Sequence, residues 1–288
     1  MKLVMYGKDE REARPGVLVS DKIIDLEIET LGFPRSLEEI FEFGLVLDIE
    51  DYIEDHKNKK AKILNKNDVY LAAPLSGIGK IVACGLNYKD HAKEMNKPLP
   101  DYPLIFAKAN SSIAGANEIL TLPPKEISKQ IDWEVELGVV IGQTCTNVSK
   151  EDALNYVGGY LIALDITARD IQEREGQWFR AKSFDGFCPL SEYILTKNDF
   201  DDGEEEVSLK LSVNGKEKQN GKLSDMIFDV SDIISFVSHS MTLYAGDLIL
   251  TGTPSGIGAG KNPPEFLKSG DKIVAEITNL GKLSVNVE

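Results

Sequence analysis

The sequence predicts a β-rich α+β fold, with a small N-terminal α/β domain over residues 1–74 and a larger domain over residues 75–288. Three observations lead to this prediction. Residues up to about 74 mix apolar, helical and charged segments, whereas the rest forms short apolar runs separated by Gly, Pro, Asn and Asp. The glycine fingerprint of a dinucleotide-binding fold is absent. The 288 residues suffice to bury a core without disulfides.

The N-terminal part begins with a short apolar run and a turn at Arg14-Pro15-Gly16. A helix is expected around Ser36–Phe43, and the charged segment Asp51–Lys62 is typical of a solvated helix or a linker. No group of side chains in this part indicates a chemical function.

The larger part is expected to consist mainly of strands. A hairpin turn is predicted at Asn214-Gly215, because this dipeptide lies between two alternating segments. One amphipathic helix is expected over Ser231–Tyr244, with an apolar face that includes Met241. The expected strands are Ile81–Ala83, Leu104–Ala107, Val135–Ile141, Leu161–Leu164, Leu209–Val213, Leu248–Leu250 and Lys272–Ile277.

Charge and composition exclude several classes of protein. A formal net charge of -15 argues against nucleic-acid binding, which needs a basic surface. No apolar run reaches the roughly 20 residues of a membrane span, and the N-terminus lacks the pattern of a signal peptide. A cytoplasmic protein without membrane contact is therefore predicted. Cys84, Cys145 and Cys188 are widely spaced and are expected to be buried free thiols.

The segment Ile131–Val140 combines an alternating pattern with two glutamates. In a strand, Glu134 and Glu136 project from one face, about 7 Å apart along the chain, and Asp132 shares that face. A solvent-exposed strand face is an equally simple explanation of this pattern. Two features favour burial: the strand continues into an apolar run, and a second apolar run, Gly158–Leu164, ends at Asp165.

Three converging carboxylates would repel one another, and burial would add to that repulsion. A divalent cation removes both problems. Oxygen ligands favour a hard ion, so Mg²⁺ or Mn²⁺ is expected, with Ca²⁺ as a third candidate. A substrate that chelates the ion could occupy its open coordination positions, and the ion would offset the acidic charge of the protein for an anionic substrate.

His91 is one of three histidines and lies three residues before Glu94. On a helix this spacing places both side chains on one face, where the carboxylate can orient the imidazole as a general base. The proline-rich segment that follows predicts that this pair is carried by a loop region. His56 is expected to be solvated, and His239 is expected to pack within its helix.

Two basic residues and one turn have open interpretations. Lys182 is either an ordinary surface lysine or, given its apolar neighbours, a partly buried cation with an anionic partner. Arg169 is either a substrate ligand or the salt-bridge partner of Asp165, four residues earlier. The glycine-rich turn Gly252–Gly258 offers backbone N–H groups for an anion.

These residues lie within motifs that resemble those of the fumarylacetoacetate hydrolase family. The segment Gly85–Glu94 is similar to the family's GxNYxxHxxE signature, and Asp132–Gly138 resembles its metal-binding strand. The resemblance extends from about Ser76 to Glu288. Further matching segments are Leu164–Gln172, Ala181–Asp185 and Gly252–Gly256.

The resemblance implies a β-roll catalytic domain, a bound Mg²⁺ or Mn²⁺ and a homodimer. It assigns Glu134, Glu136 and Asp165 as metal ligands, His91 and Glu94 as a catalytic dyad on a mobile lid, and Lys182 as a catalytic residue that, like Arg169, Gln172 and Thr253, lines the substrate pocket. The additional metal carboxylate of the tyrosine-pathway enzyme has no match here, so narrow activity on fumarylacetoacetate is not expected.

The resemblance further implies a small anionic 2-oxo acid as substrate. Hydrolysis of a C–C bond in a 2,4-dioxo acid is ranked first: His91 would activate water and Lys182 would stabilise the resulting oxyanion. Oxaloacetate decarboxylation is second and isomerisation of a 2-hydroxydienoate is third. A non-catalytic oxo-acid-binding protein is the alternative from another class.

Overall fold

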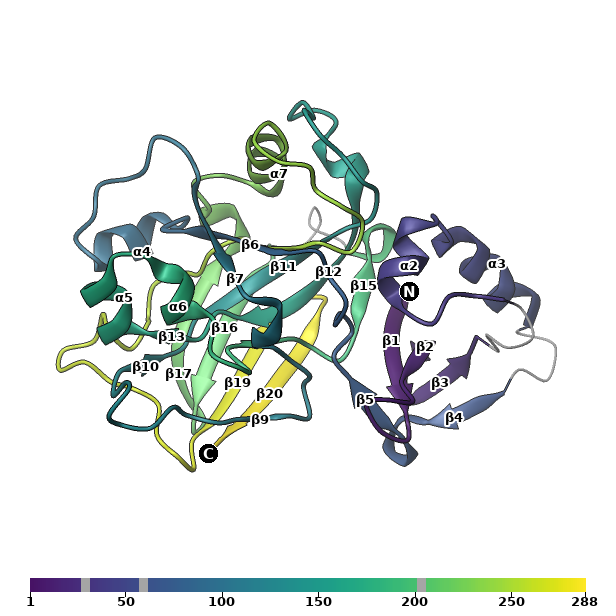
Figure 1. The fold of residues 1–288 in the computed structure, drawn as a ribbon, viewed down its shortest axis with the longest axis horizontal. Helices are drawn as coiled ribbons and strands as arrows, with labels where there is room; N and C mark the ends of the chain where they lie inside the picture. Colours follow the sequence, from purple (N-terminus) through teal and green to yellow (C-terminus); the bar gives the residue numbers. More distant parts are fainter. Residues whose placement is uncertain (27–31, 57–61, 201–205) are drawn as a thin grey trace.

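The computed structural model describes residues 1–26, 32–56, 62–200 and 206–288 (Figure 1). Strands predominate over helices, which confirms the predicted β-rich α+β class. No helix among these residues is long and apolar enough to cross a membrane.

The first 72 residues contain five strands and two α-helices within the described ranges. The predicted first helix is confirmed: the Ser36 hydroxyl accepts a hydrogen bond from the Glu39 amide at 3.2 Å, and the helix ends at the Phe43 cap. The charged segment enters a second helix, and residues 57–61 lie outside the described part. The elements are β1 (Lys2–Gly7), β2 (Arg14–Val19), β3 (Lys22–Asp25), α2 (Leu37–Glu42), α3 (Val46–His56), β4 (Ile63–Asn65) and β5 (Tyr70–Ala72).

An 11-stranded sheet within the described residues connects this N-terminal part to the rest of the chain. Its order is β4-β3-β2-β1-β15-β12-β11-β18-β6-β7, with β5 beside β1. Because β1 pairs with β15, the sheet is continuous across the predicted domain border, which stays a prediction. The added strands are β6 (Ile81–Gly85), β7 (Leu104–Lys108), β11 (Val135–Ile141), β12 (Val157–Leu164), β15 (Ile194–Thr196) and β18 (Leu248–Leu250).

A second sheet covers one face of the first. Its order is β17-β16-β19-β20-β9, and the predicted Asn214-Gly215 turn joins β16 and β17 with both residues at positive φ. Two short pairs, β10 with β13 and β14 with β8, complete the strands. Their bounds are β8 (Ile113–Ala114), β9 (Ile119–Leu120), β10 (Ile131–Asp132), β13 (Thr167–Ala168), β14 (Cys188–Pro189), β16 (Ser208–Val213), β17 (Lys216–Lys222), β19 (Lys272–Ile277) and β20 (Gly281–Val287).

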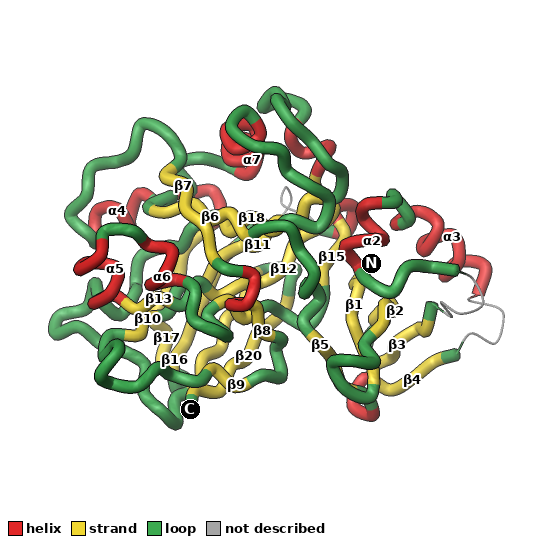
Figure 2. The backbone as a smooth tube through the Cα atoms, viewed as in Figure 1, coloured by secondary structure: helices red, strands yellow, loops and turns green. Residues whose placement is uncertain are grey.

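Three short helices gather at one end of the molecule, close to the β10–β13 pair (Figure 2). They are α4 (Lys89–Glu94), α5 (Arg169–Glu175) and α6 (Trp178–Lys182). A further helix, α7 (Val230–Ser238), is shorter than predicted. It ends at the His239 cap, so His239 is exposed rather than packed, and Met241 lies outside the helix with 42% of its surface exposed.

Strand β11 lies at the centre of two hydrophobic cores. Val135, Leu137 and Val139 pack into the core shared with the second sheet. Val140 packs on the opposite side, in a core that includes α2 and β18. Both faces of β11 are therefore buried, as the apolar run predicted, and any charged group on it needs partners. The three cysteines are buried free thiols, as expected.

Candidate active site

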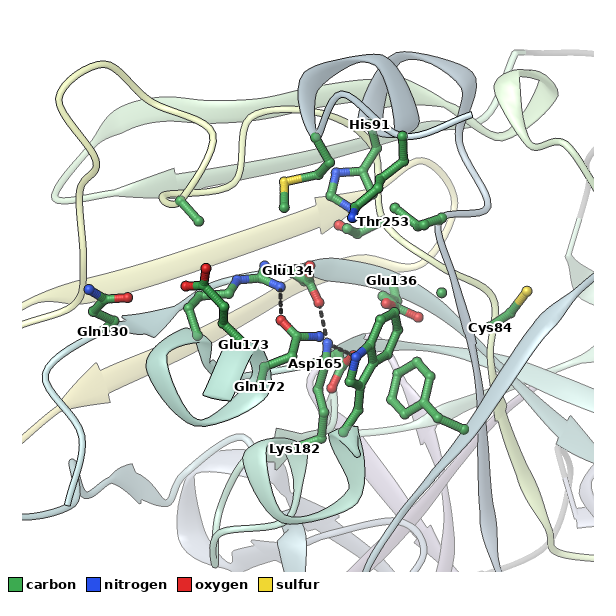
Figure 3. A pocket seen from close by; sticks show the side chains of 18 of the residues that line it. Cys84, His91, Gln130, Glu134, Glu136, Asp165, Gln172, Glu173, Lys182 and Thr253 are labelled. Atoms are coloured by element: carbon green, nitrogen blue, oxygen red, sulfur yellow. Dashed lines mark hydrogen bonds and ion pairs between the residues drawn. The ribbon is translucent and has the colours of Figure 1, made fainter. Parts of the chain in front are cut away.

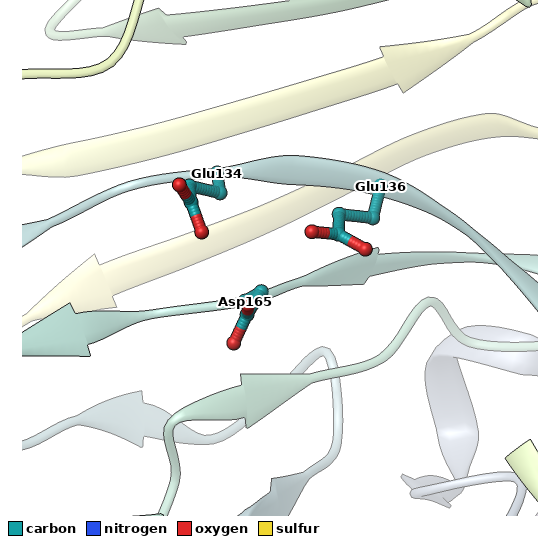
Figure 4. Close-up of side chains that lie close together, drawn as sticks. All are labelled: Glu134, Glu136 and Asp165. Carbon is teal, nitrogen blue, oxygen red and sulfur yellow. The ribbon is translucent and has the colours of Figure 1, made fainter. Parts of the chain in front are cut away.

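Three carboxylates meet where β11 begins and β12 ends (Figure 4). Val135 pairs with Leu164, which places Glu134 and Glu136 beside Asp165, the residue that directly follows β12. Each offers an oxygen that lies within 4.8 Å of the others. Glu134 and Glu136 are 3% and 2% exposed, which excludes the solvent-exposed strand face. We refer to these three residues as the carboxylate cluster.

Two buried lysines contact the carboxylate cluster from α6 and β7. Lys182 donates to Glu134 Oε2 at 2.6 Å and also to Asp165 Oδ2. Its burial and anionic partners confirm the second interpretation of this residue. Lys108 donates to Asp165 Oδ1 at 2.7 Å and to the backbone carbonyl of Lys182. Lys108 was not among the predicted site residues, although it directly follows the predicted strand Leu104–Ala107.

Arg169 contacts two acidic residues, Asp132 and Glu134, between β10 and β11. Its guanidinium donates to Asp132 Oδ2 at 2.8 Å and to Glu134 Oε1 at 2.6 Å. The alternative in which Arg169 pairs with Asp165 is therefore wrong, because α5 turns the side chain toward β10. Arg169 also donates to Gln172 at 3.0 Å, which links two of the predicted substrate-binding residues.

Asp132 has a different role from the one its spacing predicted. The expected continuous strand is interrupted after Asp132, between β10 and β11, so this carboxylate does not join the cluster. It accepts hydrogen bonds from the backbone amides of Gly258 and Ala259 at 2.6 and 3.0 Å. Asp132 therefore anchors both Arg169 and a distant turn.

The turn at residues 252–259 binds anions, as predicted, but these anions are the protein's own carboxylates. The amide of Gly252 donates to Glu136 at 2.7 Å, and the amide of Gly256 donates to both Glu94 oxygens at 3.0 and 3.1 Å. Together with the two bonds to Asp132, these contacts make the turn a common support for otherwise separate acidic residues.

The predicted pair of His91 and Glu94 lies on α4. His91 Nδ1 is 3.4 Å from Glu94 Oε2, and His91 is 5% exposed. The i, i+3 spacing on a helix produces this contact, as expected. Because Glu94 is also held by Gly256, the carboxylate is fixed between the imidazole and the turn.

A cavity of about 480 Å³ joins these groups. In Figure 3, His91 lies on one side, Lys182 lies on the other, and the carboxylate cluster lies between them. Every predicted site residue except Glu94 lines the cavity, and Glu94 contacts the lining residue His91. The other lining residues are Cys84, Gly85, Leu86, Met95, Lys97, Phe106, Gln130, Glu173, Trp178, Ala259, Pro264 and Phe266.

Thr253 lines the cavity, but its hydroxyl is engaged by the protein. It donates to the Val135 carbonyl at 2.8 Å and accepts from Gln219 Nε2 at 2.8 Å. Gln219 is fully buried and also accepts from the Val135 amide, so it fixes the start of β11. The sequence offered no signal for Gln219, because it lies on the second sheet in a polar strand.

The buried charges shift one another's pKa values in opposite directions. Burial alone would raise the pKa of Glu134, but Arg169 and Lys182 hold it well below its usual range. Burial, Asp165 and Glu134 raise the pKa of Glu136 well above its usual range. For Lys182, burial opposes the charged form, but Asp165 and Glu134 raise the pKa overall.

This donor set suits a hard divalent cation. All three groups are carboxylates, their oxygens converge within 4.8 Å, and they border a cavity from which further ligands could come. A cation would also relieve the repulsion that raises the pKa of Glu136.

Comparison with known proteins agrees with this geometry. Residues 80–288 match the model described as "Fumarylacetoacetate (FAA) hydrolase C-terminal". The chain belongs to the fumarylacetoacetate hydrolase family. The predicted resemblance is thus confirmed, and family members are enzymes that include hydrolases, tautomerases and isomerases.

Relatives within the family carry different activity names. A 2,4-didehydro-3-deoxy-L-rhamnonate hydrolase of Sphingomonas is 47% identical over 72% of this chain and 73% of its own length. A mitochondrial oxaloacetate tautomerase of Xenopus laevis is 37% identical over 99% of this chain and 89% of its own.

A solved relative supports a divalent-metal site. Maleylpyruvate hydrolase from Sphingobium, determined in complex with manganese(II) and pyruvate, superposes with a TM-score of 0.81 at 26% identity. The match covers 100% of this chain and 98% of that one. This relative and the carboxylate cluster together support divalent-metal binding by the chain.

Proposed function

We propose that this protein is a divalent-metal-dependent enzyme that converts small 2-oxo acids through their enol forms, with keto–enol tautomerisation of oxaloacetate as the leading activity. One observation carries the proposal: buried His91, in contact with Glu94, lines the same cavity as the carboxylate cluster. The oxaloacetate tautomerases among the relatives, one of them aligned over 99% of this chain, favour this substrate. Tautomerisation was not among the activities that the sequence analysis ranked for oxaloacetate.

In this proposal His91 moves the proton. The imidazole would remove a proton from the carbon beside the 2-oxo group and pass it to the 2-oxygen to give the enol, and the reverse transfer would return the enol to the ketone. Glu94, 3.4 Å from Nδ1, would orient the ring and leave Nε2 for the substrate. The low exposure of His91 excludes bulk water from the transfer.

The remaining residues hold the substrate and the cation. Glu134, Glu136 and Asp165 would bind the ion, which supplies Lewis-acid polarisation of the 2-oxo group when bound. Arg169 and Gln172 are joined by a 3.0 Å hydrogen bond on the cavity wall and would orient the substrate carboxylate. Lys182, which touches both Glu134 and Asp165, would donate to a developing oxyanion.

Hydrolytic cleavage of a 2,4-dioxo acid is the second candidate, because the same dyad can activate a water molecule. The rhamnonate hydrolase at 47% identity and the maleylpyruvate hydrolase neighbour favour it. Decarboxylation of oxaloacetate needs no attacking water and no dyad, so it would accompany either activity as a slower reaction. Isomerisation of a 2-hydroxydienoate would use the same proton transfer as tautomerisation, and the isomerase among the solved neighbours favours it.

One set of assays separates these activities. Enol-oxaloacetate decay measured by ultraviolet absorbance reports tautomerisation, and pyruvate formation from acetylpyruvate or from oxaloacetate reports hydrolysis or decarboxylation. Each assay is run with EDTA, Mg²⁺ or Mn²⁺ against a protein-free background. We expect metal-dependent tautomerisation that exceeds the other two rates. Faster acetylpyruvate cleavage would establish the second candidate instead.

A binding protein without catalysis is also tested by this set. Metal-dependent oxo-acid binding with no turnover of oxaloacetate, acetylpyruvate or a 2-hydroxydienoate would contradict the proposal. The buried His91 argues for turnover, because a protein that only binds an anion does not require a buried general base.

A further inference from the structure

Lys108 is a buried cation beside the carboxylate cluster that does not line the cavity. Its side chain is fully buried, and its ammonium donates to Asp165 Oδ1 at 2.7 Å. The same ammonium donates to the backbone carbonyl of Lys182 at the end of α6. One side chain therefore fixes both a carboxylate of the cluster and the backbone that carries its second lysine.

Asp165 is thus held by two lysines, each on a different oxygen. Lys182 contacts Oδ2 and borders the cavity, so a ligand that enters the cavity can draw its ammonium away. Lys108 contacts Oδ1 from the protein interior, where no ligand can reach it. The oxygen that faces Lys108 therefore stays occupied whatever enters the cavity.

We propose that Lys108 restricts Asp165 to one ligating oxygen and thereby favours Mg²⁺ or Mn²⁺ over Ca²⁺ at the carboxylate cluster. This inference rests on the proposed cation site. Ca²⁺ takes about six to eight oxygens and commonly uses carboxylates through both oxygens. Mg²⁺ and Mn²⁺ suit octahedral sites, which single-oxygen carboxylates and water fill.

Glu134 is likewise restricted to one oxygen that can bind a cation. Its Oε1 accepts from Arg169 at 2.6 Å and its Oε2 accepts from Lys182 at 2.6 Å. When Lys182 turns toward a ligand, Oε2 is released while Oε1 stays bonded to Arg169. In Glu136, Oε2 accepts from the Gly252 amide. Every carboxylate of the cluster therefore has one oxygen bound by a group of the protein, and Lys108 supplies that group for Asp165.

The test compares Mn²⁺ and Ca²⁺ affinities of metal-free protein by titration calorimetry. We expect the wild-type protein to bind Mn²⁺ at least ~10-fold more tightly than Ca²⁺. Lys108→Met should reduce this ratio by ~10-fold, within the ~10- to 100-fold range by which losing a ligand's partner changes metal affinity. Lys108→Gln, whose amide can still donate to Oδ1, should keep most of the preference.

A matched control removes another lysine that forms a salt bridge with a buried aspartate, away from the carboxylate cluster. Lys80 contacts the fully buried Asp247 outside the cavity, so Lys80→Met should lower stability without changing the ratio. Equal affinities of the wild-type protein for the two ions would overturn the inference even if Lys108→Met does not fold. So would an unchanged ratio in folded Lys108→Met, or equal losses in the Met and Gln variants. If no divalent ion binds the wild-type protein at all, the proposed function fails as well.

Discussion

The carboxylate cluster and helix α4 face each other across one cavity, but they are held in different ways. The cluster lies where two adjacent strands of the central sheet begin and end, between two cores, and buried cations contact two of its three members. Helix α4 has only six residues and no side-chain cap. It is bound to the 252–259 turn through Asp90 and Glu94. One side of the site is thus part of the core, and the other is attached to it.

This difference teaches how one scaffold can support several reactions. In the proposed function the cluster would bind the part that 2-oxo acids share, and its position is fixed by strand register. The dyad on α4 would handle the proton or water that distinguishes one reaction from another. If these roles hold, small changes in how α4 is attached would change the reaction without disturbing the carboxylate cluster, in keeping with the varied names among the relatives.

The largest effect is expected from the cluster. Glu136→Gln removes a cation ligand while preserving its shape and the acceptor for the Gly252 amide. We expect loss of Mn²⁺ binding in calorimetry and loss of every activity together, by more than ~1,000-fold. The variant should stay folded, because a neutral side chain relieves the repulsion with Asp165 and Glu134.

The control for Glu136→Gln is Glu118→Gln, which changes another carboxylate outside the cavity. This variant should keep its Mn²⁺ affinity and its activity. Activity of Glu136→Gln near the wild-type rate would show that the cluster is not the cation site.

The next effect is expected from α4. His91→Ala removes the general base and should slow tautomerisation and hydrolysis by ~100- to 10,000-fold. Mn²⁺ affinity should be unchanged, and residual metal-driven decarboxylation of oxaloacetate should persist. The measurements are calorimetry and the three assays on one preparation. Parallel loss of metal binding, or unchanged tautomerisation and hydrolysis, would contradict this division of roles.

The sequence predicted the cluster better than its supports, for a physical reason. Glu134 and Glu136 are two residues apart at the start of β11, and Asp165 directly follows β12, so extended backbone and strand pairing bring them together. His91 and Glu94 likewise follow from helical spacing. Lys108 reaches Asp165 across 57 positions, and the sequence gives no rule for the pairing that brings them together.

The turn at 252–259 shows the same limit. Its glycines predicted anion binding, but which anion depends on three-dimensional register. The bond from Gly258 to Asp132 spans 126 positions. The shortened α7 is a different case, because the apolar spacing of Met241 continues beyond the point where the helix ends. Periodicity therefore predicted local faces, whereas contacts between distant elements required the structure.

A smaller effect is expected from pH. The raised pKa of Glu136 means that its folded-state pKa exceeds the unfolded value. The metal-free protein is therefore destabilised as the pH rises from the unfolded-state pKa of Glu136 toward its higher folded-state pKa, because burial and the neighbouring carboxylates oppose ionisation. A cation needs the ionised form, so Mn²⁺ affinity should rise roughly tenfold per pH unit below the raised pKa. The measurement is the Tm difference between Mn²⁺ and EDTA samples from about pH 5 to about pH 8. A constant difference would contradict the assignment.

The smallest effect concerns the attachment of α4. Asp90 Oδ2 accepts from the Ser255 hydroxyl at 2.5 Å and from the Ser255 amide at 3.2 Å. Ser255→Ala removes the first bond and keeps the second, so α4 should dock less often over the cavity. Because the hydrogen bond between Ser255 and Asp90 is exposed, we expect only a ~2- to 10-fold fall in kcat/KM for tautomerisation.

Mn²⁺ affinity separates this docking effect from general damage, since the cluster does not depend on Ser255. The Mn²⁺ affinity should stay at the wild-type value in Ser255→Ala. The matched variant Ser149→Ala, which loses an exposed bond to Asp152, should change neither the Mn²⁺ affinity nor kcat/KM. A larger fall in metal affinity than in kcat/KM would show that the turn supports the cluster more than it supports α4. That result would be consistent with the bond from Gly252 to Glu136, and it would place the variable element of the site in the turn rather than in the helix.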